Sequence, residues 1–370
     1  MIPKVLWIQT INPGVAYYRI YSFAKYMHDN KRISSVIFPE FNPKMIITPD
    51  WEGNLFKDSL DFIAPYVDWA DLVICQYVST PEGLSFIQGI RQFKKPCFME
   101  IDDYVSQVPH YSCAYDQNKP GGRQEFWAIR QMAESDGVIC STQYLADSYI
   151  KYNSNVKVIQ NCVNFDLWDS HEPIKHDLVR IGWIGGATHE GDLRLVKSVL
   201  YKLLDAYQNC EVYIVSAPPP DWPKHERLHL VSAWVMIDKY PGHVKALSFD
   251  IGIAPLRDNY FNRGKSNLRY LEYSACKIPT VASNVEPFKT NFYGLLANNE
   301  EDWFNHLSAL IENEHKRKTI GSKSYEISKE QFNINRWSKT YSDFIHGALD
   351  GTFISECIGE STENRSYNIP

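Results

Sequence analysis

A cationic loop in the second half of the chain offers the clearest chemistry. The segment Asp250–Ser283 runs from an apolar stretch, DIGIAPL, into a polar loop with Arg263 and Lys265, and then into a helical stretch that Ser266 can cap. An ammonium group at a helix N-terminus adds its charge to the positive end of the helix dipole. The loop therefore predicts a site for an anionic ligand group.

A carboxylate follows in the same helical stretch. Glu272 lies nearly two turns beyond Lys265, among apolar residues. A carboxylate on a largely buried face needs a partner, and the paired hydroxyls of a ribose are a suitable one. The alternative is an ion pair with Arg269 or Lys277 on a solvated surface, and the spacing alone does not separate these two hypotheses.

A second loop with ligand-binding character is GGATHEGD, which follows the apolar run RIGWI. Gly185 and Gly186 leave room for a ligand beside the backbone, and the next helix start offers N–H groups to a diphosphate. An ordinary tight turn is the alternative, because the spacing matches neither GxGxxG nor GxxxxGK[ST]. His189 is a candidate to contact a sugar or a phosphate, against the alternative of a solvated loop histidine.

Two carboxylates, Asp102 and Asp103, end the apolar run CFMEI in the first half of the chain. At a strand end they are candidates to position an acceptor or to orient a donor sugar, and capping of the next helix is the alternative. Glu100 and Asp102 also form a DxD-like pair of the kind that holds a metal ion. The two-domain pattern argues against that hypothesis, so we expect no metal site.

Aromatic residues make up 14% of the sequence, which is consistent with clefts that stack flat rings. Trp234 is a candidate to pack near a nucleobase, with core packing as the alternative. Trp7, Trp127, Trp183 and Trp337 are expected in the core, and Arg19 and His110 are weaker site candidates.

The elements that must position these residues follow from alternating apolar and amphipathic stretches, which are typical of parallel sheets built from βαβ units. The polar stretch 169–177 divides them into two series of similar length, so we expect an α/β protein with two Rossmann-like domains. Strands are expected at 5–9, 34–39, 71–78, 97–101, 136–142 and 156–163, and then at 178–186, 211–216, 229–234, 249–256 and 280–283. Helices are expected at 16–28, 192–208, 240–247, 266–276 and 327–349.

Composition excludes several classes of protein. The 370 residues are 44% hydrophobic, which argues against disorder, and the net charge of −6 argues against bulk binding of polyanions. The eight cysteines form no CxxC pair and are expected to be mostly buried, reduced thiols. No apolar run reaches the roughly 18 residues of a membrane span, and no signal peptide is evident. We expect a cytoplasmic protein without stable membrane insertion.

The order of four motifs, GWIGG, DIGIAPL, KSNLRYLEY and IPTVAS, resembles the donor-binding domain of glycosyltransferase family 4. NCVNFDLW and the segment Gly14–Arg19 are similar to two motifs of the family's N-terminal domain. The resemblance covers most of residues 1–345 in the right order. It implies the GT-B fold, with an acceptor domain at 1–170, a donor domain at 171–326, a helix at 327–350 that returns to the first domain, and a polar tail at 351–370.

The resemblance also implies roles for particular residues. Glu272 matches the second carboxylate of the family's E-x7-E motif, which binds the ribose, and Lys265 is similar to the family's diphosphate-binding lysine. Gly264 occupies the position of the first carboxylate, so Asp258, Asn262 or the local backbone would have to replace it. The remaining donor-binding candidates are Gly14, Gly185, Gly186, Arg263, Ser266, Asn267 and Trp234.

The expected function is that of a retaining glycosyltransferase with a nucleotide-diphosphate sugar as donor, an acceptor hydroxyl and no required cofactor. Asp102, Asp103 and His189 are the candidate catalytic residues. The alternatives are a nucleotide-sugar epimerase and a non-catalytic sugar-nucleotide-binding subunit, and the protein is expected to be a monomer or a dimer.

The acceptor stays open among glycans, lipid-linked intermediates, protein side chains and small molecules. Similar phage-encoded enzymes, which act in the host cytoplasm, modify hydroxymethylated pyrimidines in DNA. Lys94, Lys95, Arg123, Arg130 and Lys151 with Lys157 are candidates for a DNA-binding rim. However, residues 1–170 contain 15 basic and 19 acidic residues, and this charge balance does not favour DNA binding.

Overall fold

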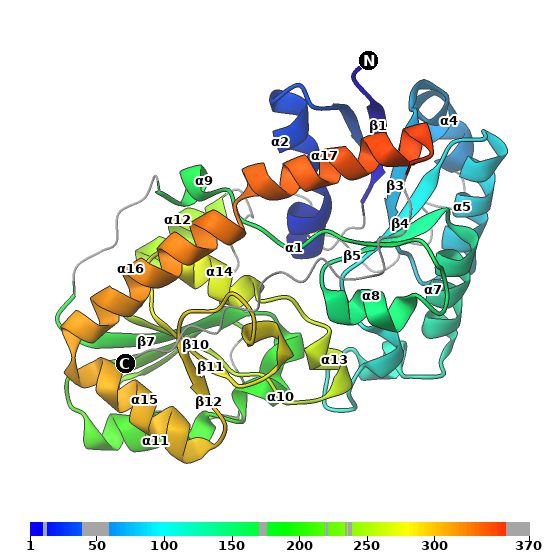
Figure 1. The fold of residues 1–370 in the computed structure, drawn as a ribbon. Helices are drawn as coiled ribbons and strands as arrows, with labels where there is room; N and C mark the ends of the chain where they lie inside the picture. The colour runs from blue at the N-terminus through cyan, green and yellow to red at the C-terminus, as the bar shows by residue number, and fades with distance from the viewer. Residues whose placement is uncertain are drawn as a thin grey trace.

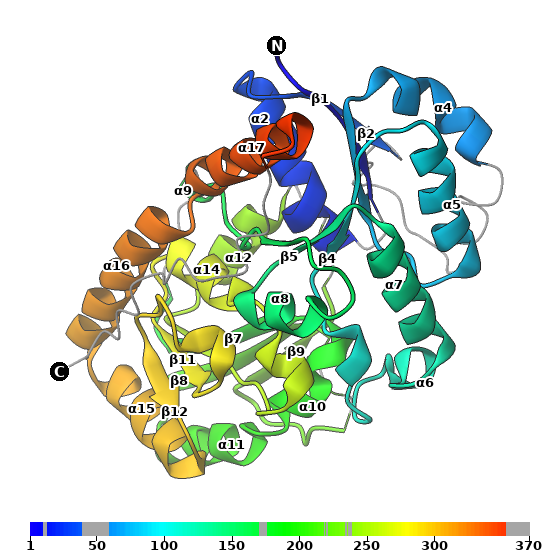
Figure 2. The ribbon, with the colours of Figure 1, turned by 45° about the vertical axis from the view of Figure 1, so that its right-hand side comes forward.

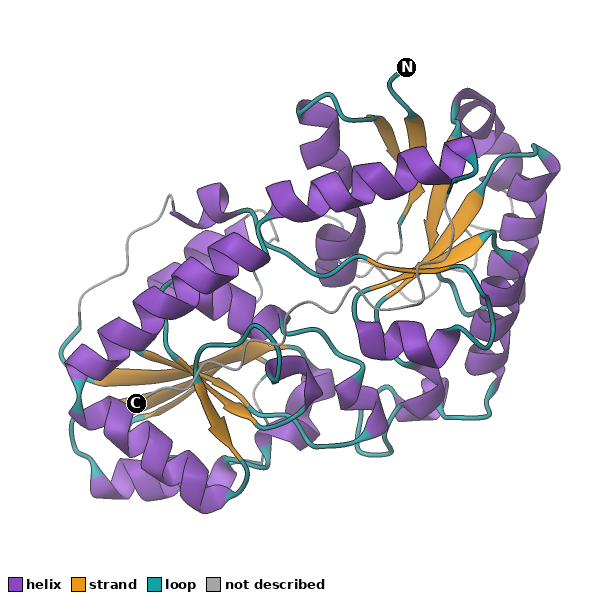
Figure 3. Cartoon of the chain, viewed as in Figure 1, coloured by secondary structure: helices purple, strands orange, loops and turns teal. Residues whose placement is uncertain are grey.

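The computed structural model describes residues 1–9, 13–38, 59–169, 176–217, 219, 221–233, 235 and 239–352. These residues form two six-stranded sheets, and every paired strand runs parallel to its neighbour (Figures 1 and 3). Helices cover the faces of both sheets (Figure 3). The expected α/β fold with two domains is confirmed.

The first domain has the strand order β2-β1-β3-β4-β5-β6. Its strands are β1 (Lys4–Ile8), β2 (Ser34–Phe38), β3 (Leu72–Gln76), β4 (Cys97–Ile101), β5 (Gly137–Cys140) and β6 (Val156–Val158). Its helices are α1 (Pro13–Ala16), the π-helix η1 (Tyr17–Tyr21), α2 (Ser22–Asp29), α4 (Ser59–Trp69), α5 (Pro81–Gln92), the 3-10 helix η2 (Val105–Gln107), α6 (Tyr115–Asn118), α7 (Arg123–Glu134), α8 (Gln143–Tyr149) and α9 (Phe165–Asp169).

The second domain has the order β12-β11-β10-β7-β8-β9. Its strands are β7 (Val179–Gly185), β8 (Cys210–Ser216), β9 (Leu228–Val231), β10 (Ile251–Ala254), β11 (Thr280–Ser283) and β12 (Leu295–Ala297). Its helices are the 3-10 helix η3 (Ala187–His189), α10 (Glu190–Leu193), α11 (Lys197–Ala206), α12 (Tyr240–Leu247), α13 (Tyr260–Arg263), α14 (Leu268–Ala275), the 3-10 helix η5 (Glu286–Phe288), α15 (Glu300–Glu312) and α16 (Glu314–Gln331). The final helix, α17 (Ile334–Asp350), lies against the first domain.

Alternation along the strands builds a core on each face of the sheet. In β1, Val5 and Trp7 join the cluster under α2 and α17, whereas Leu6 and Ile8 join the cluster under α4 and α5. Because successive side chains of a strand point to opposite faces, a strand covered by helices on both sides reads as a continuous apolar run. This is why the strands were predictable from apolar runs.

The strand order places the working edge of each domain. In the second sheet, successive strands lead outward from β7 through β8 to β9 on one side and from β10 through β11 to β12 on the other, so the order switches between β7 and β10. Ligands of open parallel sheets bind outside the carboxyl ends of the strands at such a switch point. The loop after β7 begins at Gly186, and Lys265 lies in the segment between β10 and α14. In the first sheet, Asp102 directly follows the carboxyl end of β4.

The helix predicted at 327–349 is wrong in its bounds. Helix α16 ends at Gln331, and α17 begins at Ile334 (Figures 1 and 2). Asn333 caps α17. The backbone at the break pairs with the segment between β6 and α9, since the backbone N–H of Val163 donates to Phe332 O and that of Ile334 donates to Val163 O. An apolar period continues across such a break, so the pattern alone could not locate it.

Helix α17 returns to the first domain through aromatic contacts. The centroid of the Tyr341 ring lies 5.3 Å from that of Trp7 and 5.2 Å from that of Phe23. The ring centroids of Phe344 and Phe98 are 4.9 Å apart. Figure 2 shows α16 beside the second sheet and α17 beside the first. The division of the chain at residues 170, 326 and 350 stays a prediction.

Other differences concern element ends and elements that were not predicted. The helix expected at 192–208 is divided into α10 and α11, and the helix expected at 266–276 spans Leu268–Ala275. The strand β12 and the helices α4, α5, α7, α8 and α15 were not predicted. Trp234 and residues 170–175 lie outside the described residues, as does the tail from 353 onward. None of the helices in the described ranges is long and apolar enough to cross a membrane.

Candidate active site

Lys265 and Arg269 form the cationic part of the candidate site, at the carboxyl edge of the second sheet. Lys265 follows α13, and its Nζ lies 3.3 Å from Asp103 Oδ1 of the first domain. Arg269, on α14, stacks its guanidinium on the Trp183 ring, 5.6 Å from the centroid. A Cβ at Gly185 would lie 2.6 Å from Arg269 Nη2, so the glycine is required for the arginine to reach this position.

Glu272 is the buried carboxylate of the site, with only 4% of its surface exposed. Tyr18 of the first domain donates its hydroxyl hydrogen to Glu272 Oε1 at 2.9 Å, and Tyr240 donates to Oε2 at 3.2 Å. Arg269 Nη1 also lies 3.2 Å from Oε2. Burial raises the pKa of Glu272, while the charge of Arg269 and the two tyrosine hydrogen bonds oppose that shift.

Glu272 thus combines parts of both sequence hypotheses. It pairs with Arg269, as the surface alternative required, but the pair lies in the interior rather than on a solvated surface. A carboxylate has about four lone-pair sites, so these three donors leave acceptor capacity for a further hydroxyl.

A π-helix brings the first domain into this site. The single wide turn η1, Tyr17–Tyr21, lies between α1 and α2 and follows Gly14. Two consecutive residues of this turn contact different domains. Tyr18 donates a hydrogen bond to Glu272 of the second domain, whereas Arg19 pairs with Glu100 Oε1 of the first domain at 2.6 Å. Single π-helical turns within α-helices are frequent at functional sites.

Asp102 and Asp103 face the second domain from the end of β4. Neither caps η2, whose N-cap is Tyr104 without a side-chain cap, so the capping alternative is wrong. Burial, with the charges of Asp103 and Glu100 nearby, raises the pKa of Asp102 to about 8, although Arg19 and Lys265 oppose the shift. Asp102 is therefore suited to exchange a proton near neutral pH.

Glu100, the partner that the metal-binding alternative required, is bonded elsewhere. Its carboxylate accepts hydrogen bonds from Arg19 Nε at 2.6 Å and from Gln76 Nε2 at 3.3 Å. Within the described ranges, no cluster of three or more His, Cys, Asp or Glu side chains is arranged to hold a metal ion.

His189 lies beside a buried aspartate. Its Nδ1 is 3.3 Å from Asp192 Oδ2, and its ring lies 6.4 Å from that of Trp183. Burial lowers the pKa of His189, the nearby charges of Lys265 and Arg269 act in the same direction, and the hydrogen bond to Asp192 opposes them. A neutral imidazole that donates from Nδ1 leaves Nε2 as an acceptor.

The glycine and loop candidates differ in how buried they are and in which residues they contact. Gly186 has open space where its side chain would be, since a Cβ would meet only Thr188 Oγ1 at 4.0 Å. Gly14 is half-buried in α1, and Asn267 is buried directly before α14. Ser266 does not cap α14; it accepts a hydrogen bond from Asn161 Nδ2 of the first domain at 2.7 Å.

Three weaker candidates have other partners or positions. Arg263 forms a two-pronged ion pair with Asp258, with distances of 2.7 Å and 3.0 Å. Arg19 is buried in the first domain, and His110 is exposed. Trp7 and Trp183 lie in the core as expected, while Trp127 and Trp337 are half-buried.

The sequence hypotheses missed Arg269, Tyr18, Tyr240 and Asp192 as site residues. Arg269 had a local signal, because it precedes Glu272 by three residues and so shares its helix face. Tyr18 had none, since it lies 254 residues from its partner Glu272.

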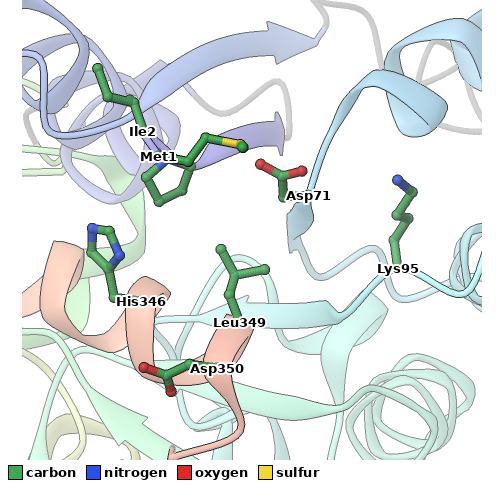
Figure 4. A pocket seen from close by; sticks show the side chains of 8 residues that line it. Met1, Ile2, Asp71, Lys95, His346, Leu349 and Asp350 are labelled. Carbon is green, nitrogen blue, oxygen red and sulfur yellow. The ribbon is translucent and has the colours of Figure 1, made fainter.

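A pocket of about 450 Å³ lies away from the candidate site (Figure 4). It lies between the N-terminus and the end of α17, and Asp71 and Lys95, which line it, precede β3 and β4. It therefore opens at the amino edge of the first sheet, opposite Asp102.

Comparison with known proteins supports the fold. No protein-family model matches the sequence, and no curated protein is significantly similar to it. Among solved structures, sucrose-phosphate synthase from Thermosynechococcus elongatus has a TM-score of 0.66 at 11% identity, over 94% of this chain and 100% of that chain. HepE from Anabaena, in complex with UDP and glucose, has a TM-score of 0.64 at 14% identity, over 93% and 99%.

A third structure, of a protein from Listeria monocytogenes assigned as a UDP-N-acetylglucosamine 2-epimerase, has a TM-score of 0.60 at 9% identity over all of both chains. At such low identities the likeness concerns the fold alone. The chain has the two-domain GT-B fold of these structures.

Proposed function

We propose that this protein is a retaining glycosyltransferase, similar to family 4, that moves a sugar from a nucleotide-diphosphate donor to an acceptor hydroxyl. One observation carries the proposal: Lys265, Arg269 and Glu272 of the second domain lie together at the switch point between β7 and β10, against Asp103 and Tyr18 of the first domain. Retention of anomeric configuration rests on the resemblance to family 4.

The proposed donor site divides by charge. The ammonium of Lys265, the guanidinium of Arg269 and the open backbone at Gly186 would hold the diphosphate, while Glu272 would accept hydrogen bonds from the ribose. As the bond from the anomeric carbon to the diphosphate oxygen breaks, negative charge grows on the diphosphate. Fixed cations in a partly buried site stabilise that charge more than water does.

The first domain would supply the acceptor side. A hydroxyl oxygen attacks the anomeric carbon, and its proton must leave to a base. Asp102, Asp103 and the departing diphosphate oxygen are the groups available for that proton, and His189 would contact the sugar or a phosphate. Asp102, with its raised pKa, suits proton exchange better than an ordinary solvated carboxylate.

The test is a screen by mass spectrometry. The purified protein is incubated with UDP-glucose first, because HepE binds UDP and glucose in a related fold, and then with other nucleotide sugars. Glycan, protein, small-molecule and modified-DNA acceptors follow. Transfer that disappears in Lys265→Ala and in Glu272→Ala supports the proposal.

A matched control pair is available on the surface of the same domain. Lys289 and Glu286 form an exposed ion pair at 3.7 Å, and their alanine variants should keep full transfer. Equal turnover in the Lys265 and Glu272 variants and in these controls would refute the assigned site. Absence of any donor turnover in the wild type would favour a non-catalytic sugar-nucleotide-binding subunit, for which Gly264 at the first carboxylate position is the argument.

A nucleotide-sugar epimerase is the second candidate, favoured by the Listeria neighbour, which matches the whole chain. Incubation with donor alone separates the two reactions. An epimerised nucleotide sugar formed without acceptor would replace the transferase proposal.

A further inference from the structure

Tyr111 of the first domain is seated in a socket of the second domain. Its hydroxyl accepts hydrogen bonds from Asn259 Nδ2 at 2.7 Å and Asn262 Nδ2 at 3.3 Å, and lies 3.4 Å from Asp192 Oδ1. The guanidinium of Arg257 lies over the ring, 5.4 Å from its centroid. Four side chains of one domain thus converge on one tyrosine of the other.

The socket is shaped for an aromatic ring. A Cβ at Gly191 would lie 2.2 Å from Tyr111 Cδ2, so any larger residue at 191 would displace the ring. The polar base of the socket is buried, with Asp192 2% exposed and Asn262 1% exposed. Buried polar groups need partners, and the Tyr111 hydroxyl adds one from the first domain to those that Asp192 and Asn262 have within the second domain.

Asp192 connects this socket to the candidate site. Its Oδ1 accepts hydrogen bonds from Asn262 Nδ2 and from the backbone N–H of Arg257, both at 2.9 Å, in addition to the Tyr111 contact. Its Oδ2 lies 3.3 Å from His189 Nδ1. The carboxylate therefore links the two groups, since one of its oxygens contacts the Tyr111 hydroxyl and the other contacts the His189 ring.

We propose that Tyr111 is an interdomain positioning residue that fixes Asp192, and through it His189, when the two domains meet. The inference rests on the proposed function for the role of His189, but the structural link does not depend on it. Nothing in the position of Tyr111 within the sequence indicates this role, because its partners lie 81 to 151 residues away.

A double-mutant cycle tests the link kinetically. Tyr111→Phe keeps the ring and removes the hydroxyl contacts, and we expect about a tenfold loss of kcat with little change in donor KM. In a His189→Ala background the same change should cost nothing further, because the group through which it acts is gone. Independent, multiplicative losses would overturn the inference. Tyr207→Phe, which removes a hydroxyl bonded to Glu312 on the surface, is the control and should leave kcat unchanged.

A spectroscopic measurement tests the link without any substrate. In ¹⁵N-imidazole NMR spectra, the His189 signals should shift in Tyr111→Phe and in Gly191→Ala but not in Tyr207→Phe, with assignment by His189→Ala. Unchanged His189 signals in both socket variants would overturn the inference and leave the proposed function standing. Shifted signals in a protein that transfers no sugar would uphold the link and refute the proposed function.

Discussion

At the scale of single residues, the two cations of the candidate site differ in how they are held. Lys265 pairs with an aspartate of the other domain and lies over the Phe261 ring, whereas Arg269 pairs with Glu272 of its own helix and stacks on Trp183. The lysine charge therefore depends on the contact between the domains, and the arginine charge is held within the second domain.

Removal of either charge should weaken binding of UDP but not of uridine. We expect Lys265→Met and Arg269→Met each to reduce UDP affinity by roughly 10- to 150-fold, since hydrogen bonds to charged groups contribute about 1.5–3 kcal/mol. Isothermal titration with UDP and with uridine measures the difference. Lys289→Met is the control, and an equal loss for both ligands would argue against diphosphate contact.

The pH dependence of stability should report Asp102. Because its pKa is raised to about 8, the folded state holds a proton that the unfolded state loses near pH 4. The contribution of Asp102 to stability is therefore fully present below pH 4 and is lost as the pH rises to 8. Relative to Asp102→Asn, the wild type should become steadily less stable between about pH 4 and 8, as urea unfolding would measure. A constant difference over this range would contradict the raised pKa.

At the scale of elements, α17 shows how a helix late in the sequence stabilises a domain formed early. Tyr341, Phe344 and Ile345 complete the core of the first sheet beside Trp7 and Phe23. These residues of α17 lie within the helix expected at 327–349, but the expected helix start was wrong, because the break at Asn333 depends on pairing with Val163. A local pattern contains no information about a partner 170 residues away.

Tyr341 separates packing from hydrogen bonding in this helix. Its ring is fully buried, while its hydroxyl has no hydrogen-bond partner among the described residues. Tyr341→Ala should lower the free energy of unfolding by about 3–5 kcal/mol, whereas Tyr341→Phe should cost nothing. Denaturant unfolding measures both, with the exposed Asp343→Ala of the same helix as control. A large loss in Tyr341→Phe would mean that the hydroxyl has a stabilising partner.

At the scale of the whole molecule, the two domains meet through polar contacts around the candidate site. Thr142 Oγ1 donates to Gly264 O at 3.0 Å, and a Cβ at Gly264 would lie 2.9 Å from Leu145. Gly264, where the family pattern expects a carboxylate, is thus a point of close approach between α8 and the loop before α14. A larger residue there would press on the buried Leu145 side chain of the first domain.

The shape of the molecule also bears on the acceptor. Lys94 and Lys95, two of the residues considered for a DNA-binding rim, precede β4 and line pockets at the amino edge of the first sheet. Asp102 follows the opposite end of the same strand. The double variant Lys94→Glu with Lys95→Glu should therefore leave transfer to any acceptor unchanged, as the mass-spectrometric assay would show. A tenfold loss with a DNA acceptor would place the DNA path on the face that we exclude.

The sequence by itself predicted the strands β1 to β11 in their chain order, the two-domain α/β fold, and the place of Glu272 in the helix after Lys265, but it left open whether Glu272 is buried. Those features depend on periodicity and on neighbours within one helix or loop, which a single sequence contains. The tertiary structure decided which side chains surround them: Tyr18 on Glu272, Asp103 beside Lys265, and Tyr111 in its socket. These contacts join residues far apart in the chain, and only the packing of one domain against the other brings them within hydrogen-bonding distance.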